Sequence, residues 1–308
     1  MTNTSFFWGF FSHQAINKLA VFTLPDEMSV FYKENLAYIT ENAVNPDKRR
    51  YAVEGEAPRH YIDLDHYPKE IKEDLPKLYW KAAVEKYSED TLMAYGIVPW
   101  QVEKMKYQLT EAFKARDMPN ILRLSADVGH YIGDAHVPLH TTENYNGQMT
   151  NQVGIHGFWE SRLPELFAQK YTFWVGQAAY IENVHQSIWE VVLSSHAALD
   201  SVLLFEKELT ESMGEDKKFT IDERNGVTVR NYSREFSARY HKMLDDQVER
   251  RMRMSVKFVG DFWYTCWVDA GQPDLTDLGK LEFSEEDDVE LKKAWLSRKL
   301  KVRKEADD

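Results

Sequence analysis

Residues 119–140 read PNILRLSADVGHYIGDAHVPLH, and this stretch decides how the chain folds. Its apolar residues recur every three or four positions, the period of an amphipathic helix; they include Ile121, Leu124, Val128 and Ile132. His130 and Asp134 are four residues apart and project from another face of the same helix. Pro138 ends the helix and brings His140 around the corner. One face can therefore pack into a core while the other holds a metal ion.

The same apolar period continues through most of the chain, which predicts an all-α fold, a single-domain helical bundle. Turn residues are sparse, with 14 Gly and 10 Pro among 308 residues. We expect helices at about residues 25–43, 68–86, 88–116, 119–136, 157–170, 176–213 and 230–270. Because no Gly/Ser/Pro-rich linker divides the chain, we expect one helical domain over residues 8–271 and a charged C-terminal tail or helix over 272–308.

The charge of the chain argues against one class of function. Lys and Arg number 38 and Asp and Glu number 50, which gives a net charge of −12. Proteins that coat nucleic acids nonspecifically depend on clustered basic residues instead. The single cysteine, Cys266, cannot form an internal disulfide. Stability must therefore come from packing or from bound metal.

The sequence carries no signature of membrane insertion. No run reaches the roughly 18 apolar residues that a spanning helix needs, so it predicts no transmembrane segment. Residues 1–7 lack the basic and apolar regions of a secretory signal, so no complete signal peptide is recognised. The sequence also indicates no obligate protein partner.

A second pair of histidine and carboxylate, His156 and Glu160, has the same four-residue spacing as His130 and Asp134. One such pair is more often a surface ion pair than a metal site. Two pairs with His140 between them reverse that expectation, because imidazole nitrogen and carboxylate oxygen are the donors that zinc prefers. The sequence therefore predicts a metal centre that uses both pairs.

The order of the motifs resembles a known superfamily. The motifs, in chain order, are WGFFSH at 8–13, PD at 46–47, HYID at 60–63, HYIGDAHVPLH at 130–140, HGFWE at 156–160 and FWYTCWVDAG at 262–271. Over roughly residues 8–271 the chain resembles the superfamily of bacterial zinc-dependent phospholipase C and the single-strand-specific nucleases of fungi and plants. The resemblance implies a helical bundle with three zinc ions in a cleft, which hydrolyses phosphoric ester bonds.

The resemblance also implies the ligands of each zinc. They are Asp47, His60, His130 and Asp134 for one zinc, His140, His156 and Glu160 for another, and Trp8 and His13 with a bridging Asp134 for the third. Two metals bridged by Asp134 would make hydroxide available near neutral pH for attack on phosphorus. The catalytic roles then fall to Asp134 and to Asp47, which could also accept a proton.

The N-terminus departs from the family pattern. In the family the Trp is the mature N-terminus and its free amine binds zinc, whereas seven residues precede Trp8 here. We therefore expect the functional protein to begin at Trp8, and only two zincs if it does not. The resemblance implies a secreted or periplasmic protein; without export the protein would be cytoplasmic.

The substrate follows from smaller features. For a nuclease, which would also have 3'-nucleotidase activity, Tyr61 could stack on a base and Asp63 could accept from it. Glu160 in place of Asp, the short interval from His140 to His156 and the lack of paired cysteines resemble the phospholipase. We expect phospholipase C-like activity on phospholipids, with single-stranded DNA or RNA as the alternative substrate.

Two other classes are weaker. A di-iron oxidoreductase needs two Glu-x-x-His motifs, and only Glu182 to His185 fits. A noncatalytic module that binds metal or lipid would retain the ligands without turnover. The other histidines are interpreted as surface or core residues, with His136 also a neighbour of the ligands; they are His66, His136, His185, His196 and His241. Asp127 is interpreted as a solvated helix carboxylate.

Overall fold

The computed structural model describes residues 10–224 and 227–281, and in this part of the chain the fold is helical, as predicted. The helices are α1 (Phe10–Ala20), α2 (Asp26–Glu34), α3 (Leu36–Glu41), α4 (Asn45–Arg49), α5 (Lys69–Asp74), α6 (Trp80–Tyr87), α7 (Glu89–Tyr95), α8 (Val98–Lys114), α9 (Met118–Ala135), α10 (Ile155–Gly157), α11 (Leu163–Phe167), α12 (Val184–Met213), α13 (Glu215–Lys218), α14 (Arg234–Met243) and α15 (Gln247–Asp269). A two-stranded antiparallel hairpin, β1 (Phe219–Arg224) and β2 (Val227–Tyr232), lies between α13 and α14.

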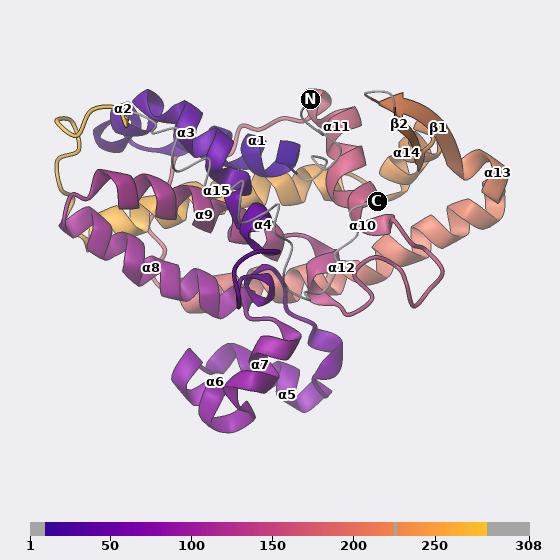
Figure 1. Cartoon of the computed structure of the whole chain (residues 1–308), viewed down its shortest axis with the longest axis horizontal. Helices are drawn as coiled ribbons and strands as arrows, with labels where there is room; N and C mark the ends of the chain where they lie inside the picture. The colour runs from indigo at the N-terminus through magenta and orange to yellow at the C-terminus, as the bar shows by residue number, and fades with distance from the viewer. Residues whose placement is uncertain (1–9, 225–226, 282–308) are drawn as a thin grey trace.

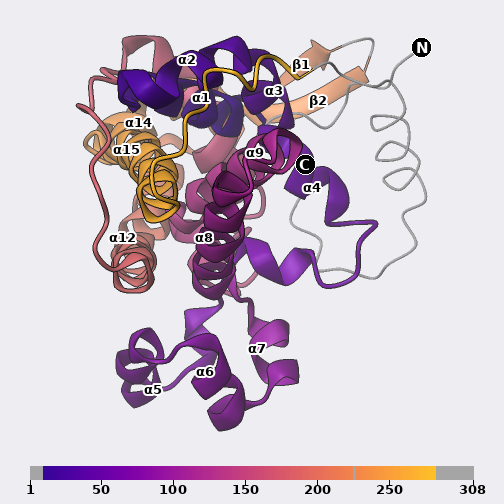
Figure 2. The same ribbon diagram turned by 90° about the vertical axis from the view of Figure 1, so that its left-hand side faces the viewer.

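Short turns connect these helices and carry part of the site. The 3-10 turns are η1 (Val21–Thr23), η2 (Asn42–Val44), η3 (Ala57–His60), η4 (Leu64–His66), η5 (Leu75–Lys77), η6 (Pro138–Thr141) and η8 (Ala168–Lys170), and η7 (Phe158–Arg162) is π-helical. Figure 1 shows α12 running lengthwise towards the hairpin and α14, while α5, α6 and α7 form a small lobe beyond α8 in both Figure 1 and Figure 2.

Several of the long predicted helices are interrupted. Gly96, with φ of 89°, and Pro99 separate α7 from α8 within the predicted helix 88–116. Asp245 and Asp246 both have positive φ, which divides the predicted helix 230–270 into α14 and α15. The first residues of the predicted helix 176–213 are not helical, and α12 begins after Asn183, whose side chain caps it. These helix boundaries are set by local backbone conformation, such as a positive φ, which the spacing of apolar residues does not reveal.

The hairpin was not predicted, although the sequence held a signal for it. Residues 219–232 read FTIDERNGVTVRNY, in which an Asn-Gly pair lies between runs rich in β-branched residues. That pattern is the strongest short-range hairpin signal. The prediction of a helix from residue 230 was therefore wrong at its first three residues, which belong to β2.

Helix α9 is the centre of the molecule. It packs against α1, α3, α8 and α15, and its predicted apolar stripe is buried. Trp263 and Trp267 of α15 are buried as well. A second hydrophobic cluster joins α12, α14 and η7 around Phe158, Phe236 and Tyr240. His130 and Asp134, the candidate metal ligands on α9, are therefore buried within this packing.

Two glycines of α9 allow α1 to approach it closely. A Cβ atom at Gly129 would lie 1.9 Å from Oδ1 of Asn17, and one at Gly133 would lie 2.9 Å from Nδ1 of His13. Such separations are shorter than van der Waals contact, so a larger residue would push α1 outward. The pair of glycines therefore sets the distance between His13 and the ligands on α9.

Among the described residues, α12 is the helix whose length and composition bear on the expectation of no transmembrane segment. Val184–Met213 is 30 residues long, and an 18-residue window in it has a mean hydropathy of 1.4, so by length and composition it could cross a membrane. Such composition is shared by core helices, and 39% of that window is buried inside the protein. Ile188, Trp189 and Val192 of α12 pack into the main hydrophobic cluster.

Part of the predicted C-terminal tail packs on the helical body. Leu275 is buried, the Asn35 side chain donates to the carbonyl of Gly279, and Leu281 donates to the Asn35 side chain. The region predicted to be tail therefore begins as an ordered segment against α2. Residues 282–308, and with them the acidic and basic runs, lie outside the described residues.

Candidate metal centre

Eight of the nine predicted ligands come together in the structure, from six separate parts of the chain. His13 lies on α1, Asp47 on α4, His60 at the end of η3, and His140 on η6; His130 and Asp134 lie on α9, and His156 and Glu160 lie on α10 and η7. Every one of these side chains is buried except that of Asp47, which is 22% exposed. Trp8, the ninth predicted ligand, lies outside the described residues.

The first group consists of Asp47, His60, His130 and Asp134. Nε2 of His130 lies 3.1 Å from Nδ1 of His60, 3.5 Å from Oδ1 of Asp47 and 3.3 Å from Oδ2 of Asp134. Nδ1 of His60 lies 2.9 Å from Asp134 Oδ2 and 3.8 Å from Asp47 Oδ1. Ligands about 2.1 Å from a tetrahedral zinc are about 3.4 Å apart, so the donor atoms of Asp47, His60 and His130 have the spacing of one zinc site. Oδ2 of Asp134 has that spacing from the two histidines.

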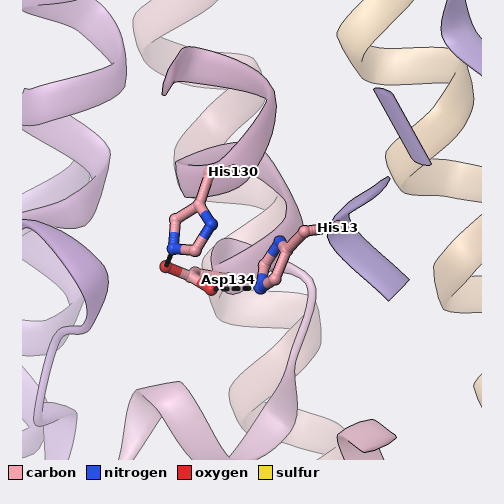
Figure 3. Close-up of side chains that lie close together, drawn as sticks. All are labelled: His13, His130 and Asp134. Carbon is pink, nitrogen blue, oxygen red and sulfur yellow. Dashed lines mark ion pairs between the residues drawn. The ribbon is translucent and has the colours of Figure 1, made fainter. Parts of the chain in front are cut away.

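Asp134 also faces a second set of ligands with its other oxygen. Oδ1 lies 3.4 Å from Nε2 of His13 and 3.7 Å from Nε2 of His140. Figure 3 shows the neighbouring rings of His130 and His13 beside the carboxylate, each next to a different oxygen. A carboxylate placed in this way can serve two metal ions at once.

The third group is His140, His156 and Glu160. Oε2 of Glu160 lies 2.8 Å from Nε2 of His156 and 3.5 Å from Nε2 of His140. The described residues thus contain three groups that could each hold a metal ion; they are His13/His130/Asp134, Asp47/His60/His130 and His140/His156/Glu160. The donors are only imidazole nitrogens and carboxylate oxygens, a set that suits zinc without excluding other transition metals.

Local backbone features place the third group. As predicted, α9 ends before Pro138, which opens the tight turn η6 and turns His140 back towards Asp134. Gly154, with φ of 97°, opens the short helix that carries His156. Glu160 lies in a π-helical turn, a wide-turn irregularity that is frequent at functional sites.

Hydrogen bonds to the outer ring nitrogens orient two of the histidines. Nδ1 of His130 donates to the carbonyl of Ala43 at 2.9 Å, and Nδ1 of His156 donates to the carbonyl of Tyr145 at 3.3 Å. Because the donating nitrogen carries the proton, Nε2 of each ring is left with its lone pair directed into the cluster. Both tautomers are therefore set for metal binding.

The carboxylates and histidines of the cluster shift one another's pKa values, downward for the carboxylates and upward for His130. Burial opposes ionisation of Asp134 and Glu160, but the facing histidines, His130 first for Asp134 and His13 first for Glu160, hold the pKa of each carboxyl well below its usual range. Burial likewise opposes charge on His130, yet Asp134 and Asp47 raise its pKa well above the usual value. In the absence of metal, protonated histidine compensates for the buried carboxylates.

The structure adds a carboxylate that the sequence analysis missed. Glu56 is buried, with Oε1 4.0 Å from Nε2 of His60, the ring nitrogen that points away from the cluster. Glu56 is in turn held by Tyr131 and by Arg49 and Arg59. It precedes His60 by four residues, the same spacing as in the other two pairs, and that spacing could have identified it.

Asp127 is a correction to the sequence analysis. It is buried rather than solvated, and it accepts two hydrogen bonds from Arg49, the residue that also contacts Glu56. Burial raises the pKa of Asp127 in spite of the Arg49 charge. Asp127, Arg49 and Glu56 thus form one chain of charged contacts that leads to His60.

Replacing Glu56 by Gln is expected to weaken zinc binding at the Asp47/His60/His130 group by about 10- to 100-fold, because the carboxylate that faces the His60 ring becomes neutral. Competition with a zinc chelator measures this change. Glu103→Gln is the matched control, since Glu103 is hydrogen-bonded to Nδ1 of His185, away from the cluster. Equal zinc affinity in the two variants would contradict the role assigned to Glu56.

The remaining histidines lie outside the candidate metal groups and contact other side chains or backbone carbonyls, in agreement with their interpretation as surface or core residues. His66 stacks on Tyr95, Nε2 of His185 is 2.9 Å from the carbonyl oxygen of Pro76, and His241 is hydrogen-bonded to the Tyr171 hydroxyl. His196 lies 3.2 Å from the Thr141 hydroxyl, one residue after His140. Because His185 pairs with Glu103, the Glu182–His185 motif does not build a di-iron site in the described residues.

His136 is buried, and its Nδ1 donates to the carbonyl of Ile132. Burial lowers the pKa of His136 to about 4. Between the usual value of about 6.5 and 4, the unfolded chain therefore takes up a proton that the folded chain does not. Stability must fall as the pH is lowered through this window, by at most about 3 kcal/mol.

Urea unfolding of the zinc-free protein at pH 7 and at pH 4.5 should show this loss, and His136→Asn should lack it. The raised pKa of His130 contributes stability that is lost as the pH rises above about 6.5, and this contribution cancels in the comparison because the parent and His136→Asn both retain His130. His66→Asn, at a more exposed ring, serves as the control and should retain the parent's pH dependence. Identical pH dependence in the His136 variant would contradict the assignment.

The two predicted substrate residues lie beside the first group but are largely enclosed. Tyr61 and Asp63, which follow His60, are 5% and 4% exposed. The carbonyl of Tyr61 accepts from Val98, and the amide of Asp63 donates to the carbonyl of Tyr95. A Cβ atom at Gly96 would lie 2.2 Å from the carbonyl oxygen of Tyr61, so the α7–α8 connection covers this segment closely.

Arg50 is a second residue that the sequence analysis missed. Its side chain is 9% exposed, and its Nη1 lies 3.7 Å from Oδ1 of Asp47, the most exposed member of the cluster. Arg50 also donates to the Tyr51 hydroxyl. A guanidinium thus lies beside the most exposed carboxylate of the cluster. The sequence contained a signal for this contact, because Asp47 and Arg50 are three residues apart and can pair on one face of a helix.

Comparison with known proteins adds no assignment. The chain matches no model of a known protein family. It also matches no curated protein.

Proposed function

We propose that the protein is a zinc-dependent hydrolase of phosphoric esters, similar to the three-zinc superfamily of phospholipase C and single-strand-specific nucleases. The observation that carries the proposal is the position of Asp134, whose two oxygens face two different sets of ligands. Adjacent metal ions that share a carboxylate suit phosphoryl chemistry, because they stabilise attacking and leaving oxygens together. A structural zinc site has no need of this arrangement.

Zinc, when bound, supplies a Lewis acid and lowers the pKa of its water ligand. The residues of the chain hold and orient this chemistry. Asp134 joins the ligand sets, and Asp47 lies at the more open side of the cluster, where it could accept a proton. Arg50, next to Asp47, is placed to donate to phosphoryl oxygens, for which the planar guanidinium is well suited.

The overall charge of −12 does not oppose a phosphate substrate. Three divalent ions would bring six positive charges, and Asp47, Asp134 and Glu160 bring three negative charges, so the loaded cluster is positive. Bound cations are often the largest local charges in a site. The acidic surface weakens long contacts with a polyanion, whereas a single phosphodiester is attracted to the cluster.

We propose phospholipids as the substrate and single-stranded nucleic acid as the alternative. A nuclease of this type needs an open aromatic face on which a base can stack. Tyr61, the residue proposed for that role, is only 5% exposed, which supports the phospholipase reading. The alternative retains support from Asp63 and Arg50, which lie on either side of the ligand His60 in the sequence.

Parallel assays with phosphatidylcholine vesicles and single-stranded DNA test both proposals on zinc-loaded protein. Release of phosphocholine without DNA cleavage is expected. Cleavage of DNA alone would reverse the order of the two substrates. Zinc binding without hydrolysis of either substrate would favour the noncatalytic module that binds metal or lipid.

Export and processing remain proposals that rest on the same resemblance. We propose that the functional protein is secreted or periplasmic and begins at Trp8. Intact mass of protein purified from its native source tests this directly, because removal of residues 1–7 leaves Trp8 at the N-terminus.

A further inference from the structure

Glu160 has the same relationship to its neighbours as Asp134, with each oxygen facing a different ligand set. Oε2 lies 2.8 Å from Nε2 of His156 and 3.5 Å from Nε2 of His140. Oε1 lies 3.2 Å from Nε2 of His13, which belongs to the other predicted site. The carboxylate is therefore positioned to bind metal on both sides.

His13 consequently lies between two carboxylates. Its Nε2 atom is 3.4 Å from Oδ1 of Asp134 and 3.2 Å from Oε1 of Glu160. Both distances match the separation of about 3.4 Å expected between two ligands of one tetrahedral zinc. Three side chains with one open position form the usual complement of a catalytic zinc site.

Other contacts within the described residues hold His13, Asp134 and Glu160 together. The Ser12 hydroxyl donates to the backbone carbonyl of Glu160 at 2.9 Å, which ties α1 to the π-helical turn. The His13 ring stacks on His130 with centroids 3.9 Å apart, and Gly133 leaves room for it.

We propose that Glu160 is a second bridging carboxylate, and that His13, Asp134 and Glu160 bind a divalent zinc ion without a donor from the N-terminal amine. The three zinc positions then form a row joined by Asp134 and Glu160. The full chain therefore takes up three zincs with residues 1–7 attached, where the family pattern alone implies two. This inference rests on the metal centre of the proposed function, and it is independent of the substrate.

Zinc counts on the full chain of 308 residues test the bridge. Each protein is stripped with a chelator, equilibrated at a free-zinc concentration buffered just high enough to fill the parent, and analysed for bound zinc. The parent should bind three zincs per chain. His156→Ala should bind two, since it removes a ligand from one site, and His13→Ala should also bind two. Glu160→Gln should bind one, the same number as the double variant His13→Ala/His156→Ala.

The comparison of Glu160→Gln with His156→Ala is decisive, because both residues belong to the third group, His140/His156/Glu160. Equal counts of two in these variants would show that Glu160 serves a single metal and would overturn the bridge. A parent that binds two zincs as the full chain but three when it begins at Trp8 would overturn the independence from the N-terminal amine. Glu160→Asp is a more conservative variant in which the shorter side chain cannot reach both sides, and it should bind two.

Circular dichroism of each zinc-free variant shows whether a lower zinc count is due to a loss of helical structure. The double variant His13→Ala/His156→Ala provides the comparison count without altering Glu160. Hydrolysis of phosphatidylcholine is measured on the same samples. Three zincs in an inactive parent would overturn the proposed function and leave the bridge standing. An active parent with two zincs would overturn the bridge and leave the function standing.

Discussion

Asp134→Asn is expected to bind one zinc in place of three and to hydrolyse phosphatidylcholine about 1,000-fold more slowly. Its oxygens lie 2.9 Å from Nδ1 of His60 and 3.4 Å from Nε2 of His13, so two ligand sets lose the same charged donor. Metal ions stabilise the charge of a transition state by several kcal/mol, and each 1.4 kcal/mol corresponds to about a factor of ten in rate.

The measurements are the zinc content of the purified variant and its rate with phosphatidylcholine. Asp200→Asn is the matched control, because Asp200 is an exposed carboxylate on helix α12 and should retain both zinc and rate. The group of His140, His156 and Glu160 should keep its zinc in the Asp134 variant. An Asp134→Asn protein with three zincs and the parent's rate would show that the carboxylate does not bridge.

Glu206→Ala should reduce the free energy of unfolding by about 3–5 kcal/mol, the largest stability change that we predict. Glu206 is fully buried, and its Oε1 lies 2.8 Å from Nζ of Lys218, which is also buried. Its other oxygen accepts from the side chain of Gln152 at 2.6 Å. Removing the carboxylate leaves the lysine charge buried without its partner, whereas removing both charges does not.

Urea unfolding of Glu206→Ala and of the double variant Glu206→Met/Lys218→Met measures this difference, and the double variant should recover most of the lost stability. The change should also reach the metal centre. Gln152, which Glu206 holds, lies in the loop between Asn146 and His156. In the same loop the Asn146 side chain accepts hydrogen bonds from the backbone amides of Gly154 and His156. Weaker zinc binding at His156 is therefore expected in Glu206→Ala, and a double variant as unstable as the single one would contradict the account.

The local part of the fold could be predicted because it depends on neighbours in sequence. The amphipathic stripe of α9, the end of that helix before Pro138 and the pairs at four-residue spacing follow from helix geometry alone. The split of α14 from α15 could not, because it depends on positive φ at Asp245 and Asp246, residues that occur in helices as well as turns. Asp127 was misjudged because its partner, Arg49, is 78 residues away.

The candidate site shows the same limit. The sequence motifs indicated which residues bind metal, but the grouping of His13 with Glu160 joins residues that only the packing of α1 against η7 brings together. Glu56 and Arg50 were missed for a related reason, since a charged residue in a sequence is more often solvated than buried. Their roles became visible only from their distances to His60 and Asp47.

The sequence by itself determined the helical class and the set of candidate metal ligands, since periodicity and ligand chemistry are properties of residues and their immediate neighbours. Only the tertiary structure decided which oxygen of Asp134 and Glu160 faces which histidine. That arrangement depends on the close approach of α1 to α9, which Gly129 and Gly133 permit. The distance between two helices is set by side chains far apart in sequence, and no local pattern encodes it.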